Sequence, residues 1–287
     1  MAFVGDIQTP LWIESLLLGS DRNAEATDSI VADLIRRRPE HLFLLGDLVS
    51  FGPCRGSWER IDARVESLRR SGTLVQAILG NHEVMLFPRT GEKNFQSLFP
   101  DHVRTGYCRT VDSVAVILLN SNFQALSGED ARTQKEWFQR TLDSLQRDVA
   151  ILHIVVCCHH SPFSNSRVVG GSEEVQREFV PPFLATPKCR LFLSGHAHTI
   201  EEFRQGKKTF LVIGGGGGAR HPLRTGAGRK WEDLFPAKKP PFQYLEVRRN
   251  KGQLVAVVRG LRDNFSGFDD SYRLSIDGQD SIRSSGD

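Results

Sequence analysis

The sequence predicts an α/β fold in which two mixed β-sheets pack face to face and helices cover their outer faces. Short apolar segments alternate with amphipathic helical patterns, five of these segments end in polar clusters, and the last third carries a hairpin pattern. Alternating strands and helices favour largely parallel strands in a layered fold. The chain has 287 residues, and we expect residues 1–276 to form a single domain and residues 277–287 a disordered tail.

The first two thirds of the chain contain five segments with the character of buried strands. They are short, rich in branched residues and apolar on both sides, as expected for strands of a covered sheet. These segments span residues 2–4, 41–45, 74–79, 151–158 and 190–193. Between them, apolar residues recur at helical spacing. The predicted helices span residues 27–38, 58–70 and 132–147.

The last third of the chain has a different pattern. A strand at residues 210–213 runs into five consecutive glycines, residues 214–218. Two further segments flank a polar turn that ends in Gly252, which is a hairpin signal, and residues 272–276 predict one more strand. We expect these strands to form the second, more antiparallel sheet. The segment 222–241 is basic and rich in Gly and Pro, and predicts a surface loop.

Composition excludes several classes of protein. The chain has 37 Lys and Arg against 34 Asp and Glu, a net charge of +3 that is too small to indicate nucleic-acid binding by bulk charge. No apolar run approaches the ~20 residues of a membrane span, and the first residues do not resemble a signal peptide. The five cysteines form no Cys-x-x-Cys pair. We therefore expect reduced thiols in a cytoplasmic protein without a structural zinc site.

Polar clusters follow the five apolar segments at the point where each predicted strand ends. In chain order they are Asp6 with Gln8, Gly46-Asp47, Gly80-Asn81-His82-Glu83, His159-His160 and Gly195-His196-Ala197-His198. Ligands of such α/β sheets lie beyond the carboxyl ends of the strands. Carboxylate, amide and imidazole groups together suit Mn, Fe or Zn rather than a soft thiolate site. The glycines before Asp47, Asn81 and His196 would allow tight turns at the sheet edge.

This ordered set resembles the calcineurin-like metallophosphoesterases. Their pattern is D-x-H, G-D, G-N-H-[ED], H and G-H-x-H, each at a strand end, and four of the five motifs match over residues 3–218. The stretch His160-Ser161-Pro162, followed by Asn165-Ser166, is similar to the one that purple acid phosphatases carry at this place. The resemblance implies the four-layer sandwich of that family.

The resemblance also implies a centre with two divalent or trivalent metal ions, Mn, Fe or Zn. Asp47 would bridge both ions, since a carboxylate has two oxygens and a charge to share. The first ion would be held by Asp6 and His198, with Gln8 as a further candidate, and the second by Asn81, His160 and His196. His82 would act as general acid or stabilise the phosphate, oriented by Glu83. A metal-bound hydroxide would then hydrolyse a small phosphate ester.

One position departs from the family pattern. The first motif has His where this chain has Gln8, and an amide oxygen is a neutral and generally weaker ligand for borderline metals. We therefore expect the first ion to bind more weakly than the second. Purple acid phosphatases also lack this His, but they carry a Tyr where this chain has Ser50, so no iron-tyrosinate colour is expected.

Two placements stay open at this level. Neighbouring strand residues face opposite sides, so only one of His159 and His160 should reach the site. The His-Ser-Pro similarity favours His160, which leaves His159 to pack or to bind a backbone carbonyl. Arg220 and His221 follow the glycine run and are either a solvated basic pair or contacts to the substrate phosphate.

The function predicted from these motifs is metal-dependent hydrolysis of phosphate monoesters or diesters, with a preference for monoesters. A cyclic-nucleotide or glycerophosphodiester phosphodiesterase is the alternative within the enzyme class. The alternative outside that class is a non-catalytic scaffold with the same fold. Scaffolds of this kind lose ligands or the Gly-Asn-His histidine, whereas this chain keeps His82 and departs only at Gln8.

Overall fold

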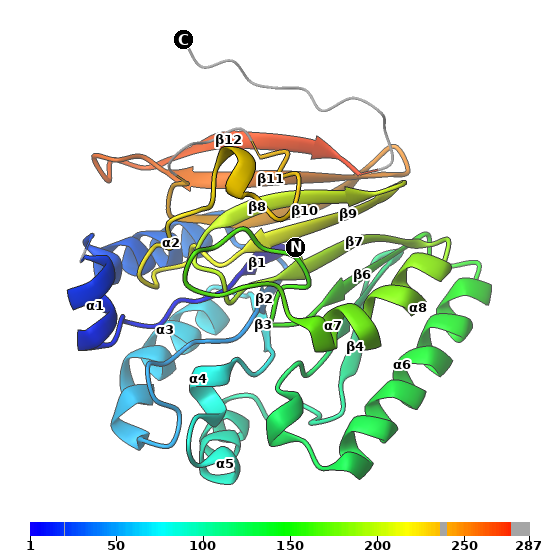
Figure 1. Ribbon diagram of the computed structural model, residues 1–287, viewed down its shortest axis with the longest axis horizontal. Helices are drawn as coiled ribbons and strands as arrows, with labels where there is room; N and C mark the ends of the chain where they lie inside the picture. Colours follow the sequence, from blue (N-terminus) through cyan, green and yellow to red (C-terminus); the bar gives the residue numbers. More distant parts are fainter. Residues whose placement is uncertain (20, 236–239, 277–287) are drawn as a thin grey trace.

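Two six-stranded mixed sheets lie at the centre of the computed structural model, which describes residues 1–19, 21–235 and 240–276 (Figure 1). In the first sheet, β1, β2 and β3 pair in parallel, and β10, β11 and β12 continue the sheet in antiparallel pairing beyond β1. Its strands, in spatial order, are β12 (Phe268–Ser275), β11 (Gln253–Leu261), β10 (Gln243–Asn250), β1 (Ala2–Val4), β2 (His41–Leu44) and β3 (Leu74–Ala77).

The second sheet has four parallel strands at its centre and an antiparallel strand at each edge. Its spatial order is β4 (Tyr107–Val111), β5 (Val114–Leu118), β6 (His153–Cys157), β7 (Cys189–Ser194), β9 (Lys208–Ile213) and β8 (Ile200–Gln205). The predicted arrangement of two mixed sheets is therefore confirmed.

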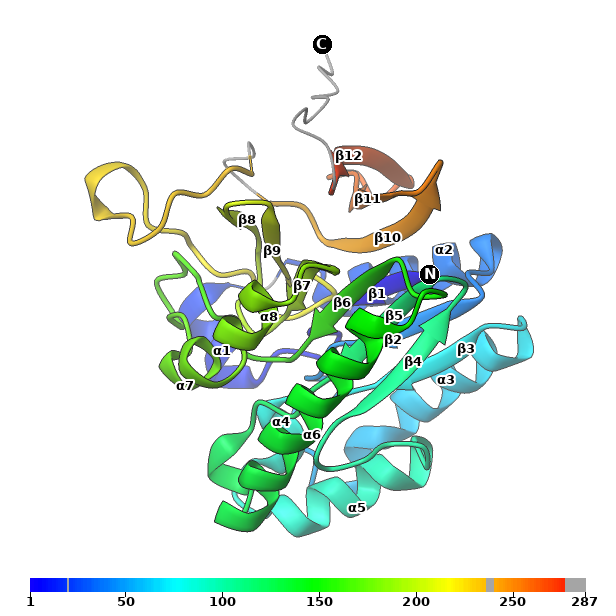
Figure 2. The same ribbon diagram turned by 90° about the vertical axis from the view of Figure 1, so that its right-hand side faces the viewer.

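Helices cover the outer faces of both sheets (Figure 2). The α-helices are α1 (Trp12–Leu18), α2 (Asn23–Arg37), α3 (Glu59–Arg70), α4 (Asn81–Val84), α5 (Pro88–Leu98), α6 (Gly128–Arg147), α7 (Glu173–Glu178) and α8 (Val180–Ala185). Short 3₁₀ turns lie at Arg55–Trp58, Phe123–Ala125 and Gly226–Gly228. Within the described ranges, none of these helices has the length and apolar character needed to cross a bilayer.

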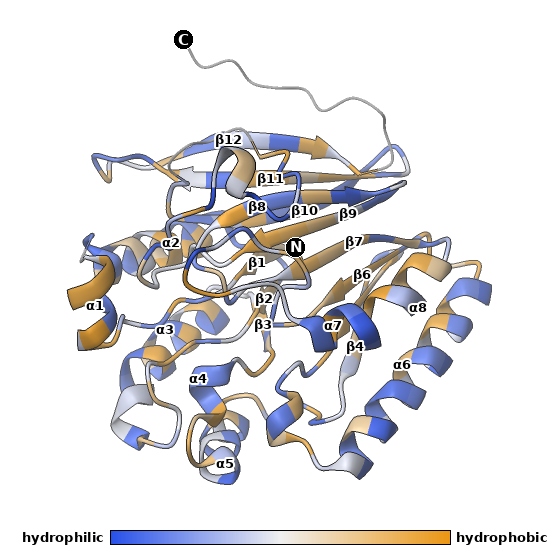
Figure 3. Ribbon diagram, in the orientation of Figure 1, coloured by the Kyte–Doolittle hydropathy of each residue, from blue (hydrophilic) through white to orange (hydrophobic). Residues whose placement is uncertain are grey.

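Three hydrophobic layers hold these elements together. The layer between the sheets contains Phe3 and Leu245 of the first sheet and Val155 of the second. Outside the first sheet, Ile30 of α2 belongs to a cluster with the strand residues, and outside the second sheet Phe138 of α6 does the same. Figure 3 shows the hydrophobic colour along β1, β7 and β9, while most of α6 is hydrophilic. Burial of apolar area in these layers is the main stabilising contribution.

The expected division of strands between the sheets is wrong. The strands of the last third do not form the second sheet by themselves: β9 pairs in parallel with β7, whereas β10 pairs with β1. The reason lies in β1, which has three residues and is fully buried. A buried strand left at a sheet edge would have unpaired amide and carbonyl groups, so β10 supplies its second neighbour.

Several predicted elements are confirmed with shifted ends, and others were missed. The helix predicted from residue 132 starts at Gly128, because Ser127 and Asp130 form a capping box: the Asp130 amide donates to Ser127 Oγ at 3.0 Å. The β4–β5 hairpin, β8 and the helices α1, α5, α7 and α8 were not predicted. All five cysteines are free thiols, as expected. The predicted tail, residues 277–287, lies outside the described residues.

Candidate metal and catalytic site

The expected ligands meet where the strands of both sheets end. Asp6 and Gln8 follow β1, Asp47 follows β2 and Asn81 opens α4 after β3; the histidine candidates follow β6 and β7. The Asp6 and Asp47 side chains are fully buried. One contact joins the two sheets directly, since the His196 amide donates to both carboxylate oxygens of Asp6 at 3.0 Å.

Three of the candidate ligands have a left-handed backbone. The φ angles are 60° at Asp6, 51° at Asp47 and 65° at His196. At Asp47 the turn also uses the preceding Gly46, whose φ angle is 85°, as expected, whereas the glycine before Asn81 serves a different purpose. A Cβ atom on Gly80 would lie 2.2 Å from Asp47 Oδ1, so this position needs a glycine for close approach.

A first group of donor atoms consists of Asp6, Gln8 and His198. His198 Nδ1 donates to the Ala219 carbonyl at 2.8 Å, which leaves its Nε2 directed at Asp6 Oδ1, 3.4 Å away. With its amide oriented to satisfy its hydrogen bonds, Gln8 donates to the carbonyl oxygens of Asp47 (2.7 Å) and Asp6 (3.3 Å), and its oxygen lies 3.2 Å from the same Nε2. When the His198 imidazole is neutral, lone pairs of three groups therefore converge on one place.

A second group consists of Asp47, Asn81 and His159. His159 Nδ1 donates to the Leu45 carbonyl at 2.8 Å. Its Nε2 then faces Asp47 Oδ2 at 3.2 Å and Asn81 Oδ1 at 3.1 Å. All of these atoms are lone-pair donors when the imidazole is neutral, so a cation is needed between them here as well.

The pKa directions agree with this need for positive charge. Burial raises the pKa of Asp6, because its charged form is poorly compensated. Burial would lower the pKa of His159, but Asp47, together with Asp6 and the Leu45 carbonyl, outweighs burial and raises it to about 9. In the described part of the chain, histidines and not Lys or Arg form the ion pairs of Asp6 and Asp47. The donor set therefore fits divalent or trivalent metal ions.

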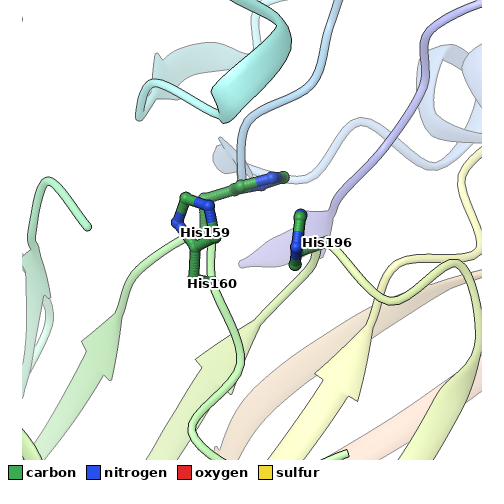
Figure 4. A group of neighbouring side chains, drawn as sticks. All are labelled: His159, His160 and His196. Atoms are coloured by element: carbon green, nitrogen blue, oxygen red, sulfur yellow. The ribbon is translucent and has the colours of Figure 1, made fainter. Parts of the chain in front are cut away.

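Both adjacent histidines reach the site, which the alternation argument did not allow. Figure 4 shows His159, His160 and His196 with their rings close together, and one ligand atom from each lies within 4.8 Å of the others. Strand β6 ends at Cys157, so residues 159 and 160 lie in a bend where strand alternation no longer applies. His160 Nδ1 lies 2.8 Å from Ser121 Oγ. Of the two, His159 makes the direct approach to Asp47.

His82 lies beside Asp47 and is held by a backbone carbonyl. Its Nδ1 donates to the Ser50 carbonyl at 2.8 Å, and its Nε2 lies 3.9 Å from Asp47 Oδ2. Burial would lower the pKa of His82, but the Asp47 carboxylate, the Ser50 carbonyl and nearby glutamates together outweigh burial and raise it. The imidazole is thus positioned to carry a proton on Nε2, next to the donor groups.

The expected orientation of His82 by Glu83 is wrong. The Glu83 carboxylate instead accepts backbone amides: Gly80 (2.6 Å) and Asp47 (2.8 Å) on Oε2, and Leu48 (2.7 Å) on Oε1. Glu83 is the third residue of α4, and its side chain turns back to the amides at the helix start, as in a capping box. Glu83 therefore shapes the turn that carries Asp47.

Arg220 and His221 lie beside His198 but have other partners. Arg220 forms an ion pair with Asp21 and donates to the Pro240 carbonyl. The His221 ring stacks on His198 with 4.4 Å between centroids, and its Nδ1 accepts the His198 amide. Both residues line a cavity of about 380 Å³ next to His198. The glycine run passes close to this ring, since a Cβ on Gly218 would lie 2.6 Å from it.

A comparison with profiles of protein families identifies the family of this chain. The profile described as calcineurin-like phosphoesterase matches residues 1–199. The chain belongs to the calcineurin-like phosphoesterase family. It is therefore classed as a metal-dependent phosphoesterase. The match spans the whole set of strand-end ligands, from Asp6 to His198.

Solved structures show the same fold for this calcineurin-like phosphoesterase. A purple acid phosphatase, PPD1, from yellow lupin (Lupinus luteus) seeds matches with a TM-score of 0.69 and 16% identity, covering 96% of this chain and 53% of that one. This chain thus spans about half the length of the lupin enzyme. GAP50 of Plasmodium matches with a TM-score of 0.66 and 14% identity, covering 98% and 89% of the two chains.

A dimetal phosphatase from Danio rerio has a TM-score of 0.57 and 13% identity, covering 96% of this chain and 98% of that one. At these identities the three structures establish the fold. A comparison with curated protein sequences found no significant match.

Proposed function

We propose that this calcineurin-like phosphoesterase hydrolyses phosphate esters, with a preference for monoesters, at a site that holds two metal ions. The observation that supports this most directly is the convergence of lone pairs at two neighbouring places. His198 Nε2 meets Asp6 and Gln8 at the first, and His159 Nε2 meets Asp47 and Asn81 at the second. Each place suits a cation, since a metal ion would be coordinated by all of these donor atoms at once.

The proposed ligand sets follow from these contacts. Asp6, Gln8 and His198 would hold the first ion, and Asp47 would be shared. Asn81, His159 and His196 would hold the second, with His160 as a further candidate. When bound, the ions supply polarisation of the phosphoryl group and make a water nucleophilic near neutral pH. The water oxygen bonds to phosphorus, the ester P–O bond breaks, and the leaving oxygen takes up a proton.

His82 is the residue that we assign to this proton transfer. The Ser50 carbonyl fixes the proton on Nδ1, so the second proton of the imidazolium is on Nε2, on the side of Asp47. The raised pKa of His82 favours that charged form. A positioned acid of this kind contributes about 10²–10⁴-fold to a rate.

One sequence similarity and two solved structures support the preference for monoesters. The stretch that begins at His160 is similar to that of purple acid phosphatases, and two structures of the same fold are described as phosphatases. A scaffold role, as suggested by the description of GAP50 as an anchor in the inner membrane complex of Plasmodium, would not require an intact donor set.

The test combines metal binding with hydrolysis. Chelator-treated protein is titrated with Mn, Fe or Zn by calorimetry, and turnover of 4-nitrophenyl phosphate and bis(4-nitrophenyl) phosphate is then measured. We expect two bound ions and faster hydrolysis of the monoester. Asp47→Asn should abolish both, whereas Asp33→Asn, a buried carboxylate bonded to Tyr244 away from the site, should retain both. Failure to bind two ions, together with no turnover, would leave only the scaffold role.

A further inference from the structure

A cavity of about 450 Å³ opens beside two residues of the site, Asn81 and His160. Much of its wall is apolar and comes from the segment after α4, with Met85 and Leu86, and from the turn that contains Phe123. Glu174 of α7 also lines it. The cavity therefore lies in direct contact with the place where the phosphoryl group would be held, and it has a mixed lining.

Leu86 is an unusual residue in this wall. Its φ angle is 60°, a left-handed conformation that is uncommon for a bulky residue, and its side chain is 77% exposed. An exposed leucine by itself carries no information. A leucine held in a strained conformation at the lip of a cavity is different, because such strain concentrates at ligand-binding positions.

Polar contacts fix several of the segments that line the cavity. Ser121 Oγ lies 2.8 Å from His160 Nδ1 and accepts the His160 amide at 2.9 Å. Asn122 donates to the Leu79 carbonyl at 3.1 Å, which ties the Phe123 turn to the end of β3. Ser172 Oγ accepts the Val175 amide and caps α7, so Glu174 lies in the first turn of that helix. The cavity is thus built on restrained elements.

The charged lining of the cavity has one sign. No Lys or Arg is found among the described residues that line it, and Glu174 is the acidic side chain of the lining. A second anionic group on a substrate would meet this carboxylate without a cationic partner. An uncharged or cationic group would be accepted, and its apolar part would bury surface against Leu86 and Phe123.

We propose that this cavity binds the leaving group of the substrate, and that the substrate is a phosphate ester of an alcohol that is uncharged or cationic and partly apolar. This proposal depends on the proposed function, because the metal site would hold the phosphorus atom of the ester next to the cavity. Esters that carry a second anionic group on the leaving alcohol are disfavoured.

The first test uses aryl phosphates that differ only in charge. Phenyl phosphates with a 4-(trimethylammoniomethyl), 4-ethyl or 4-carboxymethyl substituent carry a cationic, neutral or anionic group at the same position. Each value of kcat/KM is divided by the rate of the same ester without enzyme, which removes the difference in leaving-group reactivity. We expect kcat/KM for the anionic ester to be about 5-fold below the other two, as one unpaired charge at this range is worth about 1 kcal/mol. Glu174→Lys should reverse the order of the cationic and anionic esters.

The matched control is Glu173→Lys. It makes the same charge change in the same turn of α7, but Glu173 is exposed and does not line the cavity. We expect this variant to change the ratio of kcat/KM for the cationic and anionic esters less than 2-fold.

A second pair of variants tests the apolar part of the lining. Leu86→Ala should lower kcat/KM of the 4-ethyl ester about 3- to 10-fold. Val149→Ala removes another exposed apolar side chain and should have no effect.

A binding measurement separates this proposal from the proposed function. Benzylphosphonates with the same three substituents are not hydrolysed, and their Kd can be measured by calorimetry with metal-loaded protein. We expect the same order of affinity and the same reversal in Glu174→Lys. Equal Kd values for the three phosphonates, or equal effects of the Glu173 and Glu174 variants, would overturn the cavity proposal even if all esters turn over. Selective phosphonate binding without any turnover would support the cavity and overturn the hydrolase.

Discussion

Glu83→Gln tests how the turn that carries Asp47 is held. The wild-type carboxylate is buried and accepts the amides of Gly80 and Asp47 on one oxygen and those of Leu48 and Val49, at 2.7 and 3.3 Å, on the other. A glutamine has the same shape, but it replaces one acceptor oxygen by an NH₂ group. In either orientation of the amide, two backbone N–H groups then face a donor instead of an acceptor.

The expected loss follows from those two amides. A buried donor without a partner costs about 1–3 kcal/mol, so the free energy of unfolding should fall by about 2–6 kcal/mol. Burial and the nearby Asp47 raise the pKa of Glu83 to about 7, so the comparison belongs at pH 8, where the wild-type group is charged. Relief of the repulsion with Asp47 opposes the loss, and we expect a value near 2–3 kcal/mol. That is a large part of a typical stability of about 5–15 kcal/mol.

The assay has two parts. Urea unfolding of chelator-treated protein gives the stability without bound metal, and calorimetric titration then gives metal affinity, which should fall about 10- to 100-fold because Asp47 is no longer held in place. Glu201→Gln is the control, since Glu201 is equally buried but accepts Asn165 N and the Ser164 hydroxyl, both at 2.7 Å. A hydroxyl can rotate to accept from the new NH₂ group.

Glu201→Gln should therefore lose at most about 1 kcal/mol and keep its metal affinity. A Glu83→Gln variant within 0.5 kcal/mol of the parent, with unchanged metal binding, would refute this account of the turn.

Three further outcomes can be measured. Gln8→His replaces an amide by an imidazole and should bring the two metal affinities closer together in calorimetry; equal affinities in the parent would contradict this. His159→Ala should lower the metal content by one ion, whereas His82→Ala should keep both ions and lower kcat about 100-fold, unless His82 is not the acid. Burial lowers the pKa of His102 to about 4, and neither ring nitrogen has a partner in the described structure. The free energy of unfolding, measured with urea, should not depend on this group above pH 6.5 and should fall by about 3 kcal/mol between pH 6.5 and pH 4. The variant His102→Phe should remove this decrease.

The positions of the ligands could be predicted from the sequence because parallel strands bring their carboxyl ends together. Asp6, Asp47 and Asn81 follow three strands that pair in parallel, and His196 follows a parallel strand of the other sheet. Strand order could not be predicted in the same way. The pairing of β10 with β1 joins residues about 240 positions apart, for example Ala2 with Glu246, and no local pattern encodes such a pair.

The roles of side chains were harder to predict where the residues lie outside regular strands, because the sequence pattern then does not indicate which way each side chain points. His159 and His160 lie in a bend, so the period of two that holds in a strand does not separate them. Glu83 is next to His82, yet the spacing of three residues from Gly80 to Glu83 is the signal that matters. That spacing is typical of a capping box and could have indicated that Glu83 binds the amides at the start of α4.

The left-handed conformations of Asp6, Asp47 and His196 connect the local sequence to the site. Each costs free energy that a glycine would avoid, but a glycine supplies no ligand atom. The chain instead keeps the strained ligands and ties their backbones: the Asp6 amide donates to Gly46, the Asp47 amide to Glu83, and the His196 amide to Asp6. These ties run from one ligand segment to the next, so the position of each ligand depends on its neighbours. A site built in this way is held in shape by the fold before a metal ion arrives, which fits the proposed catalysis by preorganised groups.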